Sequence, residues 1–195
     1  MNKIRNLFSS LLLAASACCL CNTAQAGVIQ LETDKSSYRS GELITATVKA
    51  SAFSEVLTGF FLALQYQPGQ LSLQDFSFGN GLDDGLGSYQ FSEQSAGRLA
   101  LEEYADWAAA LATLAAQQNG SFILATIRFK ASTSGLFSLN LDPAYLGFLT
   151  AGGELEGADW IGSSFSVTDH ATVPAPAPLL LLCGALLLLV RPRRA

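Results

Sequence analysis

The strongest constraint on the fold is an alternation of apolar and polar residues that recurs in short runs along the middle of the chain. From Ile44 to Ala50, apolar residues alternate with Thr45, Thr47 and Lys49. The run from Ile123 to Ala131 alternates in the same way. A period of two places successive side chains on opposite faces of a strand, so one face of each strand is buried. The alternation predicts an all-β domain.

Further strand-like runs lie between turn signals such as Pro68-Gly69 and Ala96-Gly97. Residues 60–64 are apolar at both parities, which predicts a central strand covered on both faces, or one whose outer face meets something else. Between Leu73 and Phe76 the apolar parity changes, which predicts a β-bulge near Gln74-Asp75. Many short strands at this spacing predict a two-sheet sandwich. The remaining expected strands are residues 28–32, 88–93, 98–104, 136–141 and 160–168.

One segment, Asp106 to Gln118, is rich in alanine and leucine instead. Asp106 is placed as an N-cap, and Asn119-Gly120 is a stop signal. The residues expected on one apolar face are Trp107, Ala110, Leu111 and Leu114. The pattern predicts one amphipathic helix that closes an open end of the sandwich; a ligand-binding helix is the alternative.

The first 26 residues have the three parts of a secretory signal peptide. Lys3 and Arg5 form the positive end, an apolar core follows, and Ala24 and Ala26 flank Gln25 in a small-residue cleavage site. The mature chain is expected to begin at Gly27. A lipoprotein signal ending at Cys18 is the competing interpretation, although Ala15 stands where leucine is more usual.

The other end of the chain predicts a membrane anchor. Alternating prolines in the linker 171–178 prevent a helix or strand from crossing it. Residues 179–190 are apolar, and residues 191–195 carry Arg191, Arg193 and Arg194, which favour the cytoplasmic side. A helix from Ala175 to Val190 is about 24 Å long, and a permanent span usually takes ~20 apolar residues. We expect a short, temporary anchor after an exported domain of residues 27–170.

Cysteine and charge exclude several functions for that domain. The four cysteines lie in the predicted signal peptide (Cys18, Cys19, Cys21) and anchor (Cys183), so the domain has no disulfide, thiolate metal site or cysteine nucleophile. It holds sixteen acidic and six basic residues, a net charge of −10. Nucleic-acid binding requires basic patches, so no nucleic-acid partner is expected.

Few residues suggest catalysis, and no enzymatic activity is expected. His170, the only histidine, lies beside the linker. Glu102 and Glu103 are adjacent on a predicted strand and therefore point to opposite faces, so they cannot form a glycosidase pair by themselves. The loop from Gly79 to Gly87 contains Asp83 and Asp84 and partly resembles one calcium-binding repeat unit. A plain connecting loop is the alternative that we favour, and no cofactor is expected.

The C-terminal pattern resembles the PEP-CTERM sorting tails of Gram-negative bacteria. Its signature reads Val173, Pro174, Ala175, Pro176 and is followed by the apolar helix and the arginine cluster. The family usually has glutamate where this chain has Ala175. The resemblance implies export across the inner membrane, processing near the prolines by the membrane-embedded cysteine protease exosortase, and a final place at the cell surface or outside the cell. An ordinary tail anchor is the alternative.

The exported part resembles a cohesin domain over about Val28 to Asp169. The likeness rests on the order of the strands from Val28 to Leu71, with the turn Ser37–Glu42, and on Asn119–Ala131 after the helix. It implies a jelly-roll β-sandwich of about nine strands, related to carbohydrate-binding modules. In type II cohesins a helix lies between the sixth and seventh strands, where this chain has its helical segment.

Two functions follow from this resemblance. The first is binding of a protein partner on the face formed by the third, fifth, sixth and eighth strands. The residues assigned to that face are Gln65, Gln90, Glu102 and Asn140, with Ala63, Ser92, Ala100 and Ser138 around them. The second is binding of polysaccharide through exposed aromatic rings, for which Tyr38, Phe61, Tyr145 and Trp160 are the candidates.

Overall fold

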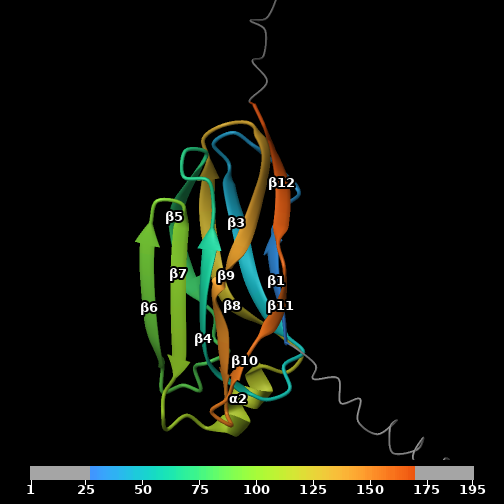
Figure 1. Cartoon of the computed structure of the whole chain (residues 1–195). Helices are drawn as coiled ribbons and strands as arrows, with labels where there is room; N and C mark the ends of the chain where they lie inside the picture. Colours follow the sequence, from blue (N-terminus) through green and yellow to red (C-terminus); the bar gives the residue numbers. More distant parts are fainter. Residues whose placement is uncertain (1–26, 170–195) are drawn as a thin grey trace, which may run out of the picture.

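The structure is a computed structural model that describes residues 27–169, which form two facing β-sheets with one short helix (Figure 1). The elements are β1 (Gly27–Thr33), β2 (Ser37–Arg39), β3 (Leu43–Ser51), β4 (Leu57–Gln65), β5 (Leu71–Phe78), β6 (Ser88–Ser95), β7 (Arg98–Ala105), α2 (Leu111–Gln117), β8 (Ser121–Ala131), β9 (Gly135–Thr150), β10 (Leu155–Glu156), β11 (Ala158–Ile161) and β12 (Ser163–Thr168). The prediction of an all-β sandwich is confirmed.

The five-stranded sheet has the order β11-β1-β3-β8-β5. The seven-stranded sheet has the order β2-β12-β9-β4-β7-β6, and β10 pairs with β9. Neighbouring strands are antiparallel, except for the parallel pairs β1–β11 and β2–β12. The predicted strand 160–168 is divided, because the chain passes from one sheet to the other at Gly162. A Cβ atom there would lie 3.0 Å from the Leu139 carbonyl oxygen.

The hydrophobic core fills the space between the two sheets. Phe60, Phe129, Phe148 and Phe165 are among its largest fully buried side chains. Burying one such ring contributes about 2–3 kcal/mol to the free energy of unfolding. The buried cluster is drawn from residues 29–167, so the segment 27–169 encloses a core of its own and is expected to fold by itself.

Two bulges shape strand β8 and its neighbours. The β5–β8 register shifts between Leu73 and Asp75, which confirms the predicted bulge. A second shift, between Val48 and Lys49 of β3, comes where β8 contains an extra residue, Leu124. Leu124 is buried and its neighbour Ile123 is 40% exposed. The expectation that Ile123 shares the buried face is therefore wrong. The bulge at Leu124 reverses which side chains face the core in the part of β8 that precedes it.

Helix α2 is shorter than predicted. It begins at Leu111, because the Asp106 carboxylate accepts a hydrogen bond from the Ala108 N–H (2.8 Å) and stabilises a turn there. Ala110 stands at the N-cap position, and its N–H donates to Asp84 Oδ2 (2.6 Å). The predicted apolar face is wrong apart from Leu114, which is the buried residue of the helix; Trp107 is 90% exposed.

The expected place of the helix is confirmed, since α2 lies at one end of the sandwich (Figure 1). The carboxamide of Gln118, just after it, accepts from the Leu57 N–H and donates to the carbonyl oxygens of Leu57 and Gly81 (2.8–2.9 Å). These bonds fix the helix against β4 and the loop after β5.

The predicted signal peptide (1–26), His170, the sorting signature, the apolar helix and the arginine cluster lie outside the described residues. Within residues 27–169, α2 is too short to cross a bilayer, and the structure offers no other candidate helix there.

Candidate functional site

The outward side of strands β9, β4, β7 and β6 differs from an ordinary solvated sheet surface. Strand β4 is a central strand, as predicted: Phe60, Leu62 and Leu64 face the core. On its other side Ala63 is fully buried, Phe61 is half-buried and Gln65 is exposed. We call the outward surface of these four strands the outer face. Its main residues are Phe61, Ala63, Gln65, Tyr89, Phe91, Glu93, Arg98, Ala100, Glu102, Tyr104, Asn140, Asp142 and Tyr145.

Glu102 lies at the centre of the outer face, between two tyrosine hydroxyls. The Tyr145 hydroxyl donates to its Oε1 atom, and the Tyr104 hydroxyl donates to its Oε2 atom (3.2 Å). The hydrogen bond to Glu102 raises the pKa of Tyr145 to about 12, and burial raises the pKa of Tyr104. Both hydroxyls therefore keep their protons at neutral pH and hold the carboxylate in place.

An aromatic ring and an arginine hold the Tyr145 ring beside this carboxylate. The Phe61 ring meets the Tyr145 ring edge-on, with centroids 5.3 Å apart. The Arg98 guanidinium lies 4.8 Å from the centroid of the Tyr145 ring and 3.9 Å from the Asp142 carboxylate. These contacts hold rigid aromatic side chains on a sheet surface.

Two glycines make room for the rings. A Cβ atom on Gly147 would lie 2.4 Å from the Phe61 ring, and one on Gly59 would lie 2.5 Å from the Tyr104 ring. Glycine inside a strand weakens the strand and often marks a close approach of another group. Here the approaching groups are the aromatic side chains of the outer face.

The edge strand β6 extends the aromatic surface into solvent. Tyr89 and Phe91 are 51% and 58% exposed, and the Tyr89 hydroxyl donates to Asp106 Oδ2 (3.2 Å). Their Cα partners on β7 are Tyr104 and Glu102. The exposed rings are therefore continuous with the ordered cluster around Glu102.

The structure brings three of the four predicted face residues to the outer face. Gln65 is paired with Asn140 and with Arg98, and Glu102 lies farther along β7. Gln90 lies on the opposite side of β6, where its Nε2 atom donates to Glu103 Oε1 (3.0 Å). The prediction that Gln90 and Ser92 face outward on β6 is therefore wrong by one residue, because Tyr89 and Phe91 face outward.

The cause of that error is a buried carboxylate on the neighbouring strand β7. Glu103 is 1% exposed and accepts hydrogen bonds from Ser88 Oγ (2.6 Å) and from Gln90. Burial raises its pKa. Ser88 and Gln90 therefore lie on the inner side of β6, and Tyr89 and Phe91 lie on the outer face, although both sides of the strand are exposed after Ser88. Glu102 and Glu103 point to opposite faces, as predicted.

The four aromatic residues proposed for sugar binding do not form one platform. Tyr38 is buried against Phe165, with ring centroids 5.4 Å apart, and Trp160 packs against the core from β11. Phe61 and Tyr145 do meet, but their ring planes are inclined by 66°. The sequence analysis did not identify Tyr89, Phe91 and Tyr104. In a hairpin that turns at Ala96-Gly97, these three residues lie on the same face as Glu102, and this was the signal available in the sequence.

The acidic loop between β5 and β6 uses its carboxylates internally. Asp83 Oδ1 accepts from the N–H groups of Gly85 and Gly87 (2.8 Å each). Asp84 accepts from the N–H groups of Leu86 and Ala110. In the part of the chain that the structure describes, no three metal-binding side chains come together. These hydrogen bonds make the loop a connection built on Asx turns.

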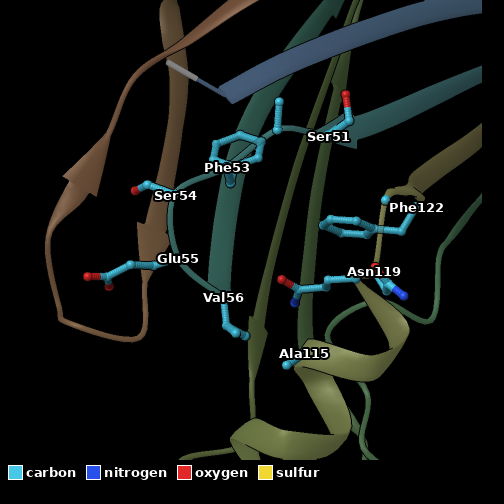
Figure 2. Close-up of a pocket in the computed structure, with 11 residues that line it drawn as sticks. Ser51, Phe53, Ser54, Glu55, Val56, Ala115, Asn119 and Phe122 are labelled. Carbon is cyan, nitrogen blue, oxygen red and sulfur yellow. The ribbon is translucent and has the colours of Figure 1, made fainter. Parts of the chain in front are cut away.

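A recess of about 440 Å³ lies between the loop after β3 and α2. Figure 2 shows the rings of Phe53 and Phe122 at its sides and Glu55 pointing away. Glu55 is the one titratable residue in the lining, and its carboxylate accepts from the Gly152 N–H (3.0 Å). The recess therefore offers no pair of groups for acid–base chemistry.

No model of a known protein family matches this chain, and no curated protein matches it. Several solved structures are similar to it. A type II cohesin domain from the cellulosome of Acetivibrio cellulolyticus is 16% identical, with a TM-score of 0.60 over 72% of this chain and 95% of that one.

Two protein complexes contain similar chains. In the complex of a CaDoc0917 variant with CaCohA2 the similar chain is 18% identical, with a TM-score of 0.60 over 73% of this chain and 99% of that one. In the Coh-OlpC–Doc435 type I cohesin–dockerin complex from Clostridium thermocellum the similar chain is 11% identical, with a TM-score of 0.57 over 77% of this chain and 99% of that one. Residues 27–169 therefore have the cohesin-like β-sandwich fold.

Proposed function

We propose that the sandwich is a non-enzymatic protein-interaction domain that binds its partner through the outer face. The observation that carries this proposal is the Glu102 carboxylate, held between Tyr104 and Tyr145 within a surface of half-buried and exposed aromatic rings. Tyrosine and arginine are enriched among the residues that dominate protein interfaces. Side chains that are already fixed lose little entropy on binding.

The fold supports this function. Among the similar solved structures are chains in complexes, one of them a cohesin with a dockerin. The outer face carries three carboxylates (Glu93, Glu102 and Asp142) against one arginine, Arg98. A partner that presents a basic side chain near its centre has the complementary charge.

The test uses residues 27–169 as bait for the exported proteins of the source bacterium. The wild-type domain is expected to retain a partner that Tyr145→Ala loses. Ile123→Ala, a truncation of an exposed residue on the opposite sheet, is the control and is expected to retain it. Equal retention by the three proteins would overturn the proposal.

Polysaccharide binding is the second candidate, and the exposure of Tyr89 and Phe91 on one strand favours it. Sugar rings stack on exposed aromatic faces, so a glycan panel tests it directly. Glycan binding that is lost in Phe91→Ala would replace the protein-partner proposal with this one.

We also propose export across the inner membrane of a Gram-negative bacterium, a membrane-anchored precursor, and release or transfer to the surface by an exosortase-type enzyme. The sequence patterns at residues 1–26 and 171–195 support this route. The mass of the mature protein tests it: a chain that ends near Pro176 supports processing, and an intact Arg194 contradicts it. Neutral residues at Arg191, Arg193 and Arg194 are expected to leave the precursor uncut.

A further inference from the structure

The edge strands of the two sheets are unequally protected against pairing with another strand. Strand β2 is three residues long and β11 is four. Strand β5 has eight residues but is interrupted by its bulge. Strand β6 has eight residues in an unbroken register with β7. Short length and bulges are the usual means of protecting an edge, so β6 is the unprotected one.

The sequence of β6 adds none of the other protective features. Ser88–Ser95 contains no proline and no lysine, and its single charge is Glu93. Every residue of the strand after Ser88 is exposed. A long, regular edge with exposed Tyr89 and Phe91 is a template for one more strand.

We propose that β6 pairs antiparallel with β6 of a second copy of this chain, around a two-fold axis at Phe91. This register places Phe91 opposite its own copy and Tyr89 opposite Glu93. On the other side of the sheet it places Gln90 opposite Ser92. No like charges face each other, and aromatic cross-strand pairs are favourable.

A second copy fits this edge because of the side chains that meet in that register: Phe91 meets Phe91, and the single charge, Glu93, meets Tyr89 and not a second carboxylate. A two-fold interface uses the same surface on both copies. Residues 88–94 are paired about Phe91 in this arrangement. The side chains of the outer face would then continue without interruption from one copy to the other.

Dimerisation does not depend on the proposed partner, but it would enlarge the surface that is offered to the partner. Two outer faces in one continuous sheet would make the surface bivalent, and bivalent binding strengthens attachment to a repetitive target. Each copy also carries a net charge of −10 in its exported domain. Screening of this repulsion is expected to strengthen the dimer as salt is added.

The test is sedimentation velocity on residues 27–169 over a range of concentrations. The wild-type domain is expected to pass from monomer to dimer. Phe91→Glu and Phe91→Lys each place like charges at the axis, and each is expected to raise the dissociation constant by about tenfold or more. An equimolar mixture of the two variants is expected to recover a dimer, because opposite charges then meet.

Matched controls are Leu136→Glu and Leu136→Lys, which change an exposed residue on β9, away from the edge. They are expected to dimerise like the wild type, and circular dichroism checks that all variants are folded. A wild-type domain that stays monomeric at about 100 µM, a dimer that persists in both Phe91 variants, or a mixture that stays monomeric would overturn the proposal. None of these results changes the expected binding of a partner to a single outer face.

Discussion

The two sheets of the sandwich share one core but have very different outward surfaces. The five-stranded sheet presents threonines and short ion pairs, such as Lys49–Glu32 (2.5 Å) and Arg128–Asp75 (2.6 Å). The seven-stranded sheet presents aromatic rings around one carboxylate. Exposed ion pairs contribute little to stability and keep a surface soluble, whereas ordered exposed aromatics favour binding. This difference supports the proposal that a partner binds the outward surface of the seven-stranded sheet.

The largest expected effect of this difference is on partner affinity. Truncation of Tyr145 to alanine removes the contacts with Phe61, Glu102 and Arg98, and is expected to weaken partner binding by about 2 kcal/mol or more. The matched change on the five-stranded sheet, Thr126→Ala, is expected to leave the affinity unchanged. Isothermal titration calorimetry with the captured partner measures both. A similar loss for Thr126→Ala would remove the distinction between the sheets.

Packing of the outer face gives the next largest effect. Gly147→Ala would place a methyl group into the Phe61 ring and is expected to lower the free energy of unfolding by about 1–3 kcal/mol. Gly157→Ala is the matched control, since a Cβ atom there meets no heavy atom within 4 Å. Urea denaturation compares the two. Equal stability of both variants would show that Phe61 is free to move.

The sequence predicted the five-stranded sheet better than the outer face, for a physical reason. Alternation from Ile44 to Ala50 reflects one buried and one solvated side, and the structure has that arrangement. On β6 the same rule gives no signal, because both sides of this edge strand are exposed after Ser88. Gln90 lies on the inner side, where it donates to the buried carboxylate of Glu103 on the neighbouring strand, and sequence periodicity does not reveal that contact.

Long-range contacts explain the other differences. The N–H group of Ala110 donates to Asp84, 26 residues earlier. The start of α2 therefore depends on a distant loop, which the helix propensity of the segment itself does not reveal. The extra residue Leu124 in β8 is recognised only against the register of β3. Similarly, the division of residues 158–168 between two sheets depends on the close approach of Gly162 to β9.

A smaller effect concerns pH. Burial raises the pKa of Glu103, so the folded state favours its protonated form. This contribution to stability is complete below the ordinary pKa of about 4.3 and is lost as pH rises through the raised pKa. Glu103→Gln is therefore expected to become more stable relative to the wild type as the pH rises from 4 to 8. Thermal unfolding at both pH values measures this difference, and a constant difference would contradict it.

The smallest effect is on the ionisation of one tyrosine. The hydrogen bond to Glu102 raises the pKa of Tyr145 to about 12. Glu102→Gln removes that charge and is expected to return the pKa of Tyr145 towards its ordinary value of about 10. Absorbance at alkaline pH, with Tyr145→Phe to identify the signal, follows the change. An unaltered titration would show that the two side chains do not interact.

The most direct measurement for the outer face is side-chain footprinting by hydroxyl radicals, with and without the captured partner. Binding at the outer face predicts that oxidation of Tyr89, Phe91 and Tyr145 falls when the partner is present, while oxidation of Leu43 and Ile123 on the other sheet is unchanged. Protection of Leu43 and Ile123, with unchanged oxidation of the three aromatic residues, would contradict the assignment of binding to the seven-stranded sheet.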